Sequence, residues 1–169
     1  TIFAMQVARD IAAKGKRVLY TDFEMTLRQL ALRYESPNFP PTFFRAEMDM
    51  EAPVGDVLKG IEAAAVTNMA EGVFIDNITA LSQSLDKSSD AGSLMASLNA
   101  LKRKYNWTLV ILNHVPKMFS GSVPLSLSAI QGSAKLNQLI DDAVGLGQSS
   151  RDRSMVYVKQ CKWRNGEVV

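Results

Sequence analysis

The sequence contains little that suits an extracellular or membrane-spanning protein. Its 169 residues include a single cysteine, Cys161, so no internal disulfide and no cysteine cluster for zinc is expected. No apolar run approaches the roughly 20 residues that cross a bilayer, and no secretory segment opens the printed sequence. These absences exclude a membrane-spanning chain and a membrane partner, and they favour a reducing, cytoplasmic compartment.

The composition is equally free of strong charge bias. Lys and Arg number 19 against 17 Asp and Glu, so any nucleic-acid contact is expected to be local. Ten Gly and six Pro exclude a collagenous or low-complexity chain. A hydrophobic fraction of 47% is enough for one core, and we predict one domain over residues 1–169. The chain starts at Thr1 and is apolar from Ile2 onward, which we take as the mark of a fragment.

Short apolar runs that alternate with helical patterns predict an α/β fold. The expected strands are buried, parallel and rich in β-formers, at residues 17–22, 72–76, 108–113, 142–146 and 155–159. Helices are expected over residues 1–14, after a cap at Thr26, and around residues 54–65 and 94–101. Such alternation predicts a mainly parallel sheet covered by helices on both faces. Two Pro- or Ser-rich stretches, residues 35–53 and 117–128, are expected to be long loops.

Polar residues come directly after the predicted strands, where a ligand would bind. In open α/β sheets ligands lie beyond the carboxyl ends of the strands, and the residues there are Asp22, Glu24, Asp76, Asn77, Asn113, His114, Lys159, Lys162 and Arg164. Each has an ordinary structural alternative: Asp76 or Asn77 can cap a turn, Glu24 can be a surface acid, and His114 can be a structural histidine. Their succession at the ends of consecutive strands favours a shared site.

Phosphoryl transfer is a reaction that uses this set of residues. It needs a divalent cation held by a hydroxyl and a carboxylate, an acid that orients water, and donors near the transferred group. Asp76 suits the metal, Glu24 suits the water, and His114 suits the phosphate. A phosphate-binding loop of the form G-x-x-x-x-G-K-[ST] is nevertheless missing from all 169 residues.

The same segments resemble, in order, the RecA, DnaB and RadA class of P-loop ATPases. Residues 1–6 (TIFAMQ) resemble the segment directly after the Gly-Lys of the P-loop, with Thr1 at the hydroxyl position. Residues 18–25 (VLYTDFEM) resemble the strand that ends in the catalytic Glu, and residues 73–76 (VFID) the Walker B strand. Residues 109–114 (LVILNH) are similar to the strand whose last residue senses the γ-phosphate. Residues 113–117 (NHVPK) have the pattern Asn-His-x-x-Lys, which is most similar to that of RepA-like and AAA_25-type ATPases of plasmids and mobile elements.

Two further segments extend the resemblance toward the end of the chain. Residues 129–135 (AIQGSAK) resemble the end of the mobile loop that faces DNA in this class. Residues 162–166 (KWRNG) resemble the K-x-R-N-G element of replicative helicases, whose Lys and Arg reach a neighbouring subunit's ATP site. Trp163 departs from the small or polar residue that is common there, and it either fills a sheet face or packs at a subunit interface. Cys161 is expected to be structural or incidental, because no redox partner lies within sequence reach.

The resemblance implies a fold, cofactors and roles for individual residues. It implies a RecA-like sheet whose P-loop strand lies inside the sheet and is missing here, with the cut immediately after Gly-Lys. It implies ATP and Mg²⁺ as cofactors: Thr1 and Asp76 hold the metal, Glu24 activates water, and His114 senses phosphate. Lys162 and Arg164 then contact nucleotide in a neighbouring copy, which implies a homo-oligomer, commonly a ring of six. Isolated subunits, and this fragment above all, are expected to be poor ATPases.

A contact with single-stranded DNA is expected from residues 117–135. This stretch holds two cations, Lys117 and Lys135, with one aromatic residue and many hydroxyls. The alternative is an ordinary surface loop.

Three functions remain open from the sequence. The first is a DNA-linked motor ATPase in replication, mobilisation or recombination, such as a helicase. The second is a regulatory or scaffold ATPase whose nucleotide state controls assembly without DNA translocation. The third, an inactive ATPase, is disfavoured by the joint presence of Glu24, Asp76 and His114. A GTPase is disfavoured by the lack of an N-K-x-D motif, and a small-metabolite kinase would leave the K-x-R-N-G element without a purpose.

Overall fold

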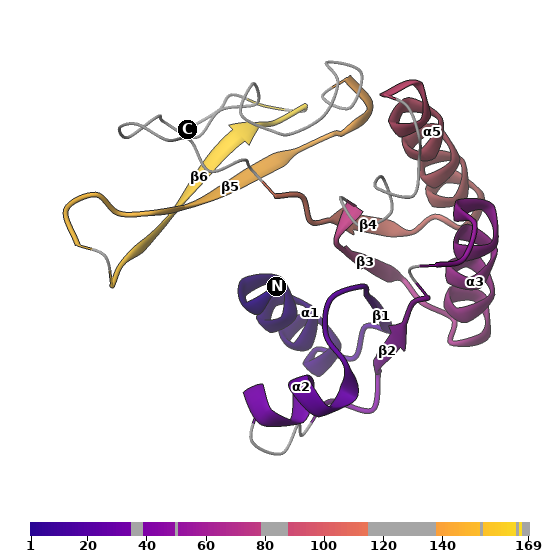
Figure 1. Cartoon of the computed structure of the whole chain (residues 1–169), viewed down its shortest axis with the longest axis horizontal. Coiled ribbons are helices and arrows are strands. Elements are labelled where there is room, and N and C mark those ends of the chain that lie inside the picture. Colours follow the sequence, from indigo (N-terminus) through magenta and orange to yellow (C-terminus); the bar gives the residue numbers. More distant parts are fainter. Residues whose placement is uncertain are drawn as a thin grey trace. The chain divides into compact units, whose positions relative to one another are not determined.

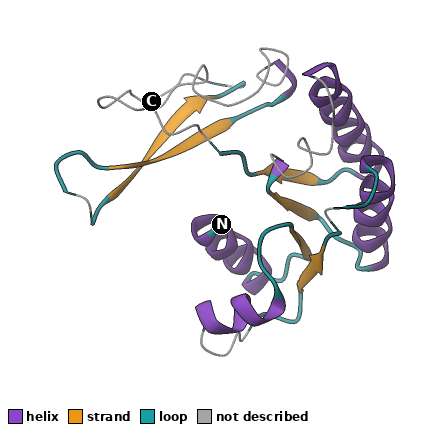
Figure 2. Ribbon diagram, in the orientation of Figure 1, coloured by secondary structure: helices purple, strands orange, loops and turns teal. Residues whose placement is uncertain are grey.

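The computed structural model describes residues 1–34, 39–49, 51–78, 88–114, 138–152, 154–164 and 166. The chain divides into two compact units, Thr1–Asn113 and His114–Val169, each with a sheet of its own (Figures 1 and 2). The expectation of one domain over the whole chain stays a prediction. Among the described residues, no helix has both the length and the apolar character that a bilayer crossing demands.

The first unit is a parallel sheet between two layers of helices. Its strands are β1 (Val18–Asp22), β2 (Phe43–Glu47), β3 (Gly72–Asp76) and β4 (Thr108–Ile111), in the spatial order β2-β1-β3-β4. All three strand pairings are parallel. The helices α1 (Ile2–Ala13) and α2 (Leu27–Arg33) lie on one face, and α3 (Val54–Thr67) and α5 (Ser88–Tyr105) lie on the other (Figure 1). The predicted α/β class and the parallel sheet with helices on both faces are confirmed in this unit.

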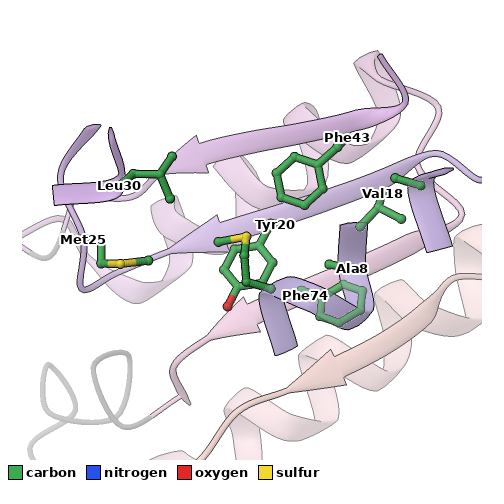
Figure 3. Packing of buried hydrophobic residues seen from close by; sticks show 9 residues of the cluster. Ala8, Val18, Tyr20, Met25, Leu30, Phe43 and Phe74 are labelled. Atoms are coloured by element: carbon green, nitrogen blue, oxygen red, sulfur yellow. The ribbon is translucent and has the colours of Figure 1, made fainter. Parts of the chain in front are cut away.

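The sheet is buried most completely at its centre. Every residue of β1 and β3 is buried, as expected for strands that are covered on both faces. On the face of α1 and α2, Tyr20 stacks between Phe43 and Phe74, with ring centroids 6.2 and 5.8 Å away. The cluster around this stack contains Met5, Ala8, Ala12, Val18, Tyr20, Met25, Leu30, Phe43 and Phe74 (Figure 3). The apolar runs of the sequence therefore form the core that they predict.

A capping box starts α2 immediately after the loop that leaves β1. The Thr26 hydroxyl accepts a hydrogen bond from the Gln29 backbone N–H at 3.3 Å, and the Gln29 side chain accepts one from the Thr26 N–H at 2.8 Å. This confirms Thr26 as the predicted cap. The cap also fixes where the loop carrying Glu24 ends.

The prediction of a loop over residues 35–53 is wrong in part, because β2 lies within it. The sequence just before β2 contains three prolines, Pro37, Pro40 and Pro41, which suggest a loop when they are considered alone. The five residues of β2 nevertheless pair in parallel with β1, from Val18 opposite Phe43 to Asp22 opposite Glu47. Pairing with a buried neighbour outweighs the weak local pattern.

The second unit contains an antiparallel ribbon, whereas the sequence predicts buried parallel strands there. Its strands, β5 (Ala143–Gln148) and β6 (Val156–Lys162), pair antiparallel, so the prediction of their direction is wrong. The connection from Ser149 to Met155 is too short for the crossover that parallel strands require. An added Cβ at Gly147 would lie only 2.5 Å from the ring of Tyr157 on the paired strand, so a larger residue there would require that ring to move.

One face of this ribbon is apolar and open. Val144, Leu146, Val156 and Val158 share it through cross-strand pairing, and each is exposed by 44% or more.

The buried face of α3 gives a test of the first unit's core. Ile61 is fully buried, whereas Val66 on the same helix is 46% exposed. We expect Ile61→Ala to lower the free energy of unfolding by about 2–5 kcal/mol, because it leaves a cavity. The matched variant Val66→Ala is expected to cost about 0.5 kcal/mol or less. Urea denaturation measures both, and equal losses would contradict this placement of the core.

Candidate functional site

The carboxyl ends of β1 and β3 lie side by side. Asp22 and Asp76 are register partners on these neighbouring strands, and the Phe23 N–H donates to the Asp76 carbonyl at 2.8 Å. The loop after β1 therefore stays against the end of β3. Beyond this point the Asn77 side-chain amide donates to Glu24 Oε1, so the residues that leave the two strands are in direct contact.

Thr1 joins the same edge from the start of α1. Its hydroxyl makes no capping hydrogen bond to the helix and instead donates to Glu24 Oε2 at 3.4 Å. Its nitrogen lies 4.0 Å from Asp76 Oδ2. Thr1, Glu24 and Asp76 are predicted site residues from three separate segments of the sequence, and the fold brings these three together.

Asp22 is a buried carboxylate whose oxygens are both occupied. The backbone N–H groups of Glu24 and Met25 donate to its Oδ1 at 2.9 and 2.8 Å. The Arg45 guanidinium donates to its Oδ2 through Nε at 3.2 Å and Nη2 at 3.0 Å. With its charge paired and its acceptors used, Asp22 holds the loop and is not available to a ligand.

Asp76 is equally buried but keeps one acceptor free. Its Oδ2 accepts a 2.5 Å hydrogen bond from the Tyr20 hydroxyl. Its Oδ1 is buried and has no hydrogen-bond partner among the described residues. A buried carboxylate oxygen without a partner is costly, so this atom marks a position where a ligand would be stabilising. Of the two buried aspartates, only Asp76 has such an atom.

Tyr20 keeps its proton in this environment. Burial is the largest cause that raises the pKa of Tyr20 well above its ordinary value, and the hydrogen bond to Asp76 raises the pKa further. The hydroxyl therefore remains a donor, and it fixes the Asp76 carboxylate from one side. No sequence pattern indicates this role, because Tyr20 lies in an apolar strand and its ring belongs to the core (Figure 3).

The residues at this edge fit a hydrated magnesium ion. No group of three or more His, Cys, Asp or Glu side chains within the described ranges could hold a metal, so a site made of protein carboxylates and imidazoles alone does not fit. Mg²⁺ commonly uses one or two protein oxygens and keeps several waters or phosphate oxygens. The free Asp76 Oδ1 and the Thr1 hydroxyl supply oxygens of that type.

The other predicted site residues belong to the second unit of the chain. His114 belongs to the second unit and is exposed, and its role as a phosphate sensor stays a prediction. Lys162 donates to the Ile140 carbonyl at 2.8 Å, while Arg164 pairs with Asp141; both tie the end of β6 to residues before β5. Their role toward a neighbouring copy also stays a prediction. Lys117 and Lys135 lie outside the described residues.

Sequence reasoning assigns no function to three residues of the site. Asn77 stands out in the sequence only as the residue after Asp76, and Tyr20 only as part of a strand. Arg45 lies in β2, within a stretch expected to be a loop, so no pattern indicates that it reaches Asp22. All three act on neighbours that are distant in sequence, and sequence spacing carries no signal for such contacts.

Comparison with known proteins adds no family or function. No protein-family model matches the chain, and no curated protein matches it. The inference of a function therefore depends on the residues of the site themselves.

The Tyr20 hydroxyl gives a pH-dependent test of the site. Because folding raises the pKa of Tyr20, its contribution to stability is present below the unfolded pKa of about 10 and is lost as pH rises above it. Tyr20→Phe should therefore destabilise the protein at pH 8, and this difference from the original chain should shrink by about 1 kcal/mol at pH 11. Urea denaturation at the two pH values measures it. A difference that stays constant would show that Tyr20 titrates normally.

Proposed function

We propose that the complete protein binds and hydrolyses ATP as a RecA-like P-loop ATPase. The observation that carries this proposal is the convergence of Thr1, Glu24 and Asp76 at one edge of a parallel sheet. Parallel α/β sheets bind ligands at this edge. A hydroxyl, a free buried carboxylate oxygen and an exposed acid are three of the groups that phosphoryl transfer to water uses.

Each residue has a separate part in the proposed reaction. Asp76 Oδ1 and the Thr1 hydroxyl would hold Mg²⁺, directly or through water, and Tyr20 keeps the Asp76 carboxylate oriented. When bound, the ion neutralises charge on the phosphate oxygens as the terminal phosphoryl group is transferred. Glu24 is exposed and held by Asn77 and Thr1, and it would orient or deprotonate the attacking water.

In the proposed complete protein a P-loop strand would lead into α1, and the strand order limits where such a strand could lie. The strand order is β2-β1-β3-β4, so the connection from β2 through α3 to β3 passes over β1 and runs toward β4. The helix of this connection, α3, lies on one face of the sheet (Figure 1). Because parallel crossovers are right-handed, a helix on the opposite face, such as α1, connects strands in the reverse direction (Figure 1). A parallel strand leading into α1 must then lie on the β3 side of β1. The position available there is the outer edge of β4, which pairs only with β3 among the described strands.

The remaining parts of the proposal concern other copies and DNA. His114 would contact the γ-phosphate, and Lys162 and Arg164 would complete the site of a neighbouring subunit in a homo-oligomeric ring. The motor function on single-stranded DNA is preferred to a regulatory or scaffold ATPase because the resemblance includes the DNA-facing loop. Hydrolysis that DNA stimulates would favour the motor, whereas hydrolysis that only assembly stimulates would favour the scaffold.

Substitution of Glu24 tests the proposed reaction. In a longer chain that supplies the nucleotide-binding loop, we expect Glu24→Gln to lower ATP turnover by about 10²-fold, because the amide cannot accept a proton from water. Nucleotide binding should persist, since Glu24 is not expected to hold the phosphates. Turnover measured with a phosphate-release assay and nucleotide binding measured by calorimetry separate the two effects.

The control for this experiment is another exposed acid. Glu71 is exposed and directly precedes β3, at the opposite end of that strand from Asp76, and Glu71→Gln should leave turnover unchanged. If Glu24→Gln also leaves it unchanged, Glu24 has no part in hydrolysis.

The proposed DNA contact is tested by its salt dependence. Each phosphate contact adds about 0.7 to the slope of log affinity against log salt for a single strand. Lys117→Ala with Lys135→Ala should lower affinity and reduce that slope by up to about 1.4. The double variant Lys16→Ala with Lys59→Ala removes two lysines that are paired with acids and serves as the control. Equal slopes in the original chain and in both double variants would show that residues 117–135 do not contribute to DNA binding.

A further inference from the structure

Arg45 is a buried cation that reaches from β2 to the loop after β1. Only 8% of its side chain is exposed. Its guanidinium donates twice to Asp22 Oδ2, and its Nη2 also donates to the Met25 carbonyl. The planar guanidinium can bind a carboxylate and a nearby carbonyl at the same time, which a lysine ammonium cannot do with the same geometry. Arg45 thus holds both ends of the segment from Asp22 to Met25.

Asp22 transmits this contact to the backbone of Glu24. The carboxylate that binds Arg45 through Oδ2 accepts the N–H groups of Glu24 and Met25 through Oδ1. One side chain therefore links the guanidinium on β2 to the peptide group that carries the Glu24 side chain. Without Arg45, Asp22 would be a buried charge with no cation, and it would gain by turning toward water. The two N–H bonds would be lost with that movement.

We propose that Arg45 is a positioning residue for Glu24 and acts through Asp22. This inference rests on the proposed function, in which Glu24 orients water. The Glu24 carboxylate is exposed, so its direction depends on where the backbone places it and on its contacts with Asn77 and Thr1. Small displacements of a catalytic group reduce turnover strongly while substrate binding persists. Among the described residues, the ion pairs of the Arg45 guanidinium are with Asp22 and Glu47.

The positioning role is tested first in the chain itself, without nucleotide. Arg45→Lys keeps the charge but loses the paired contact, and it is the variant more compatible with folding than Arg45→Met. We expect amide hydrogen exchange at Glu24 and Met25 to become about 10-fold faster in Arg45→Lys, with Phe74 and Ile75 in β3 within about 2-fold of the original. Arg28 is exposed on α2, and Arg28→Met is the control. This variant should leave the exchange rates of all four amides unchanged.

Two results of this measurement would overturn the proposal. Unchanged exchange at Glu24 and Met25 in Arg45→Lys would mean that the loop does not depend on Arg45. An equal rise at all four amides would mean that Arg45 only stabilises the fold as a whole.

Turnover in the complete protein gives the second test. Arg45→Lys should lower kcat by about 10-fold and leave the KM for ATP within about 2-fold. Combined with Glu24→Gln, Arg45→Lys should cause no further loss, because the group that it positions has already been removed. A full additional loss in the double variant would show that Arg45 acts on another step. If Glu24→Gln alone changes nothing, the proposed role of Glu24 in hydrolysis fails, and the exchange measurement still decides whether Arg45 holds the loop.

Discussion

The burial of two carboxylates on neighbouring strands is the constraint around which the first unit is organised. Asp22 and Asp76 are register partners at the ends of β1 and β3, and each is 1% exposed or less. Unpaired charges in such a position would be strongly destabilising. The fold offsets the cost at Asp22 with an arginine from β2 and two backbone N–H groups. At Asp76 it uses a tyrosine hydroxyl and the start of α1, whose dipole favours negative charge nearby.

The different partners give the two aspartates different capacities. The oxygens of Asp22 are both occupied, so this residue shapes the loop that presents Glu24. Asp76 keeps Oδ1 without a partner among the described residues, so it remains able to bind a cation. The same packing that covers these residues also brings the exposed Glu24 to the edge of the buried pair. A supporting acid, a binding acid and a solvent-accessible acid thus occupy one strand edge, which is the arrangement from which we infer phosphoryl transfer to water.

Much of the fold could be predicted from local patterns, and the exceptions have physical causes. The strands β1 and β3 are apolar except for their last one or two residues and are buried throughout, which is typical of strands between two helical layers. The Thr26 cap and the helices arise from short-range hydrogen bonding and periodicity, which are local properties. Local patterns miss β2 because its stability comes from pairing with β1. The predicted directions of β5 and β6 are wrong because the apolar runs alone ignore the length of the chain between them.

The sequence by itself determined the α/β class, the strands β1, β3 and β4 of the parallel core, and the acids that could take part in phosphate chemistry. It did so because hydrophobic periodicity and strand-end position are encoded over a few residues. The tertiary structure alone decided that Asp22 is saturated and Asp76 is not, and that Tyr20 and Arg45 govern these two acids. Those contacts join residues that are 23 and 56 positions apart. Hydrogen bonds of this kind depend on which strands become neighbours, and only folding settles that order.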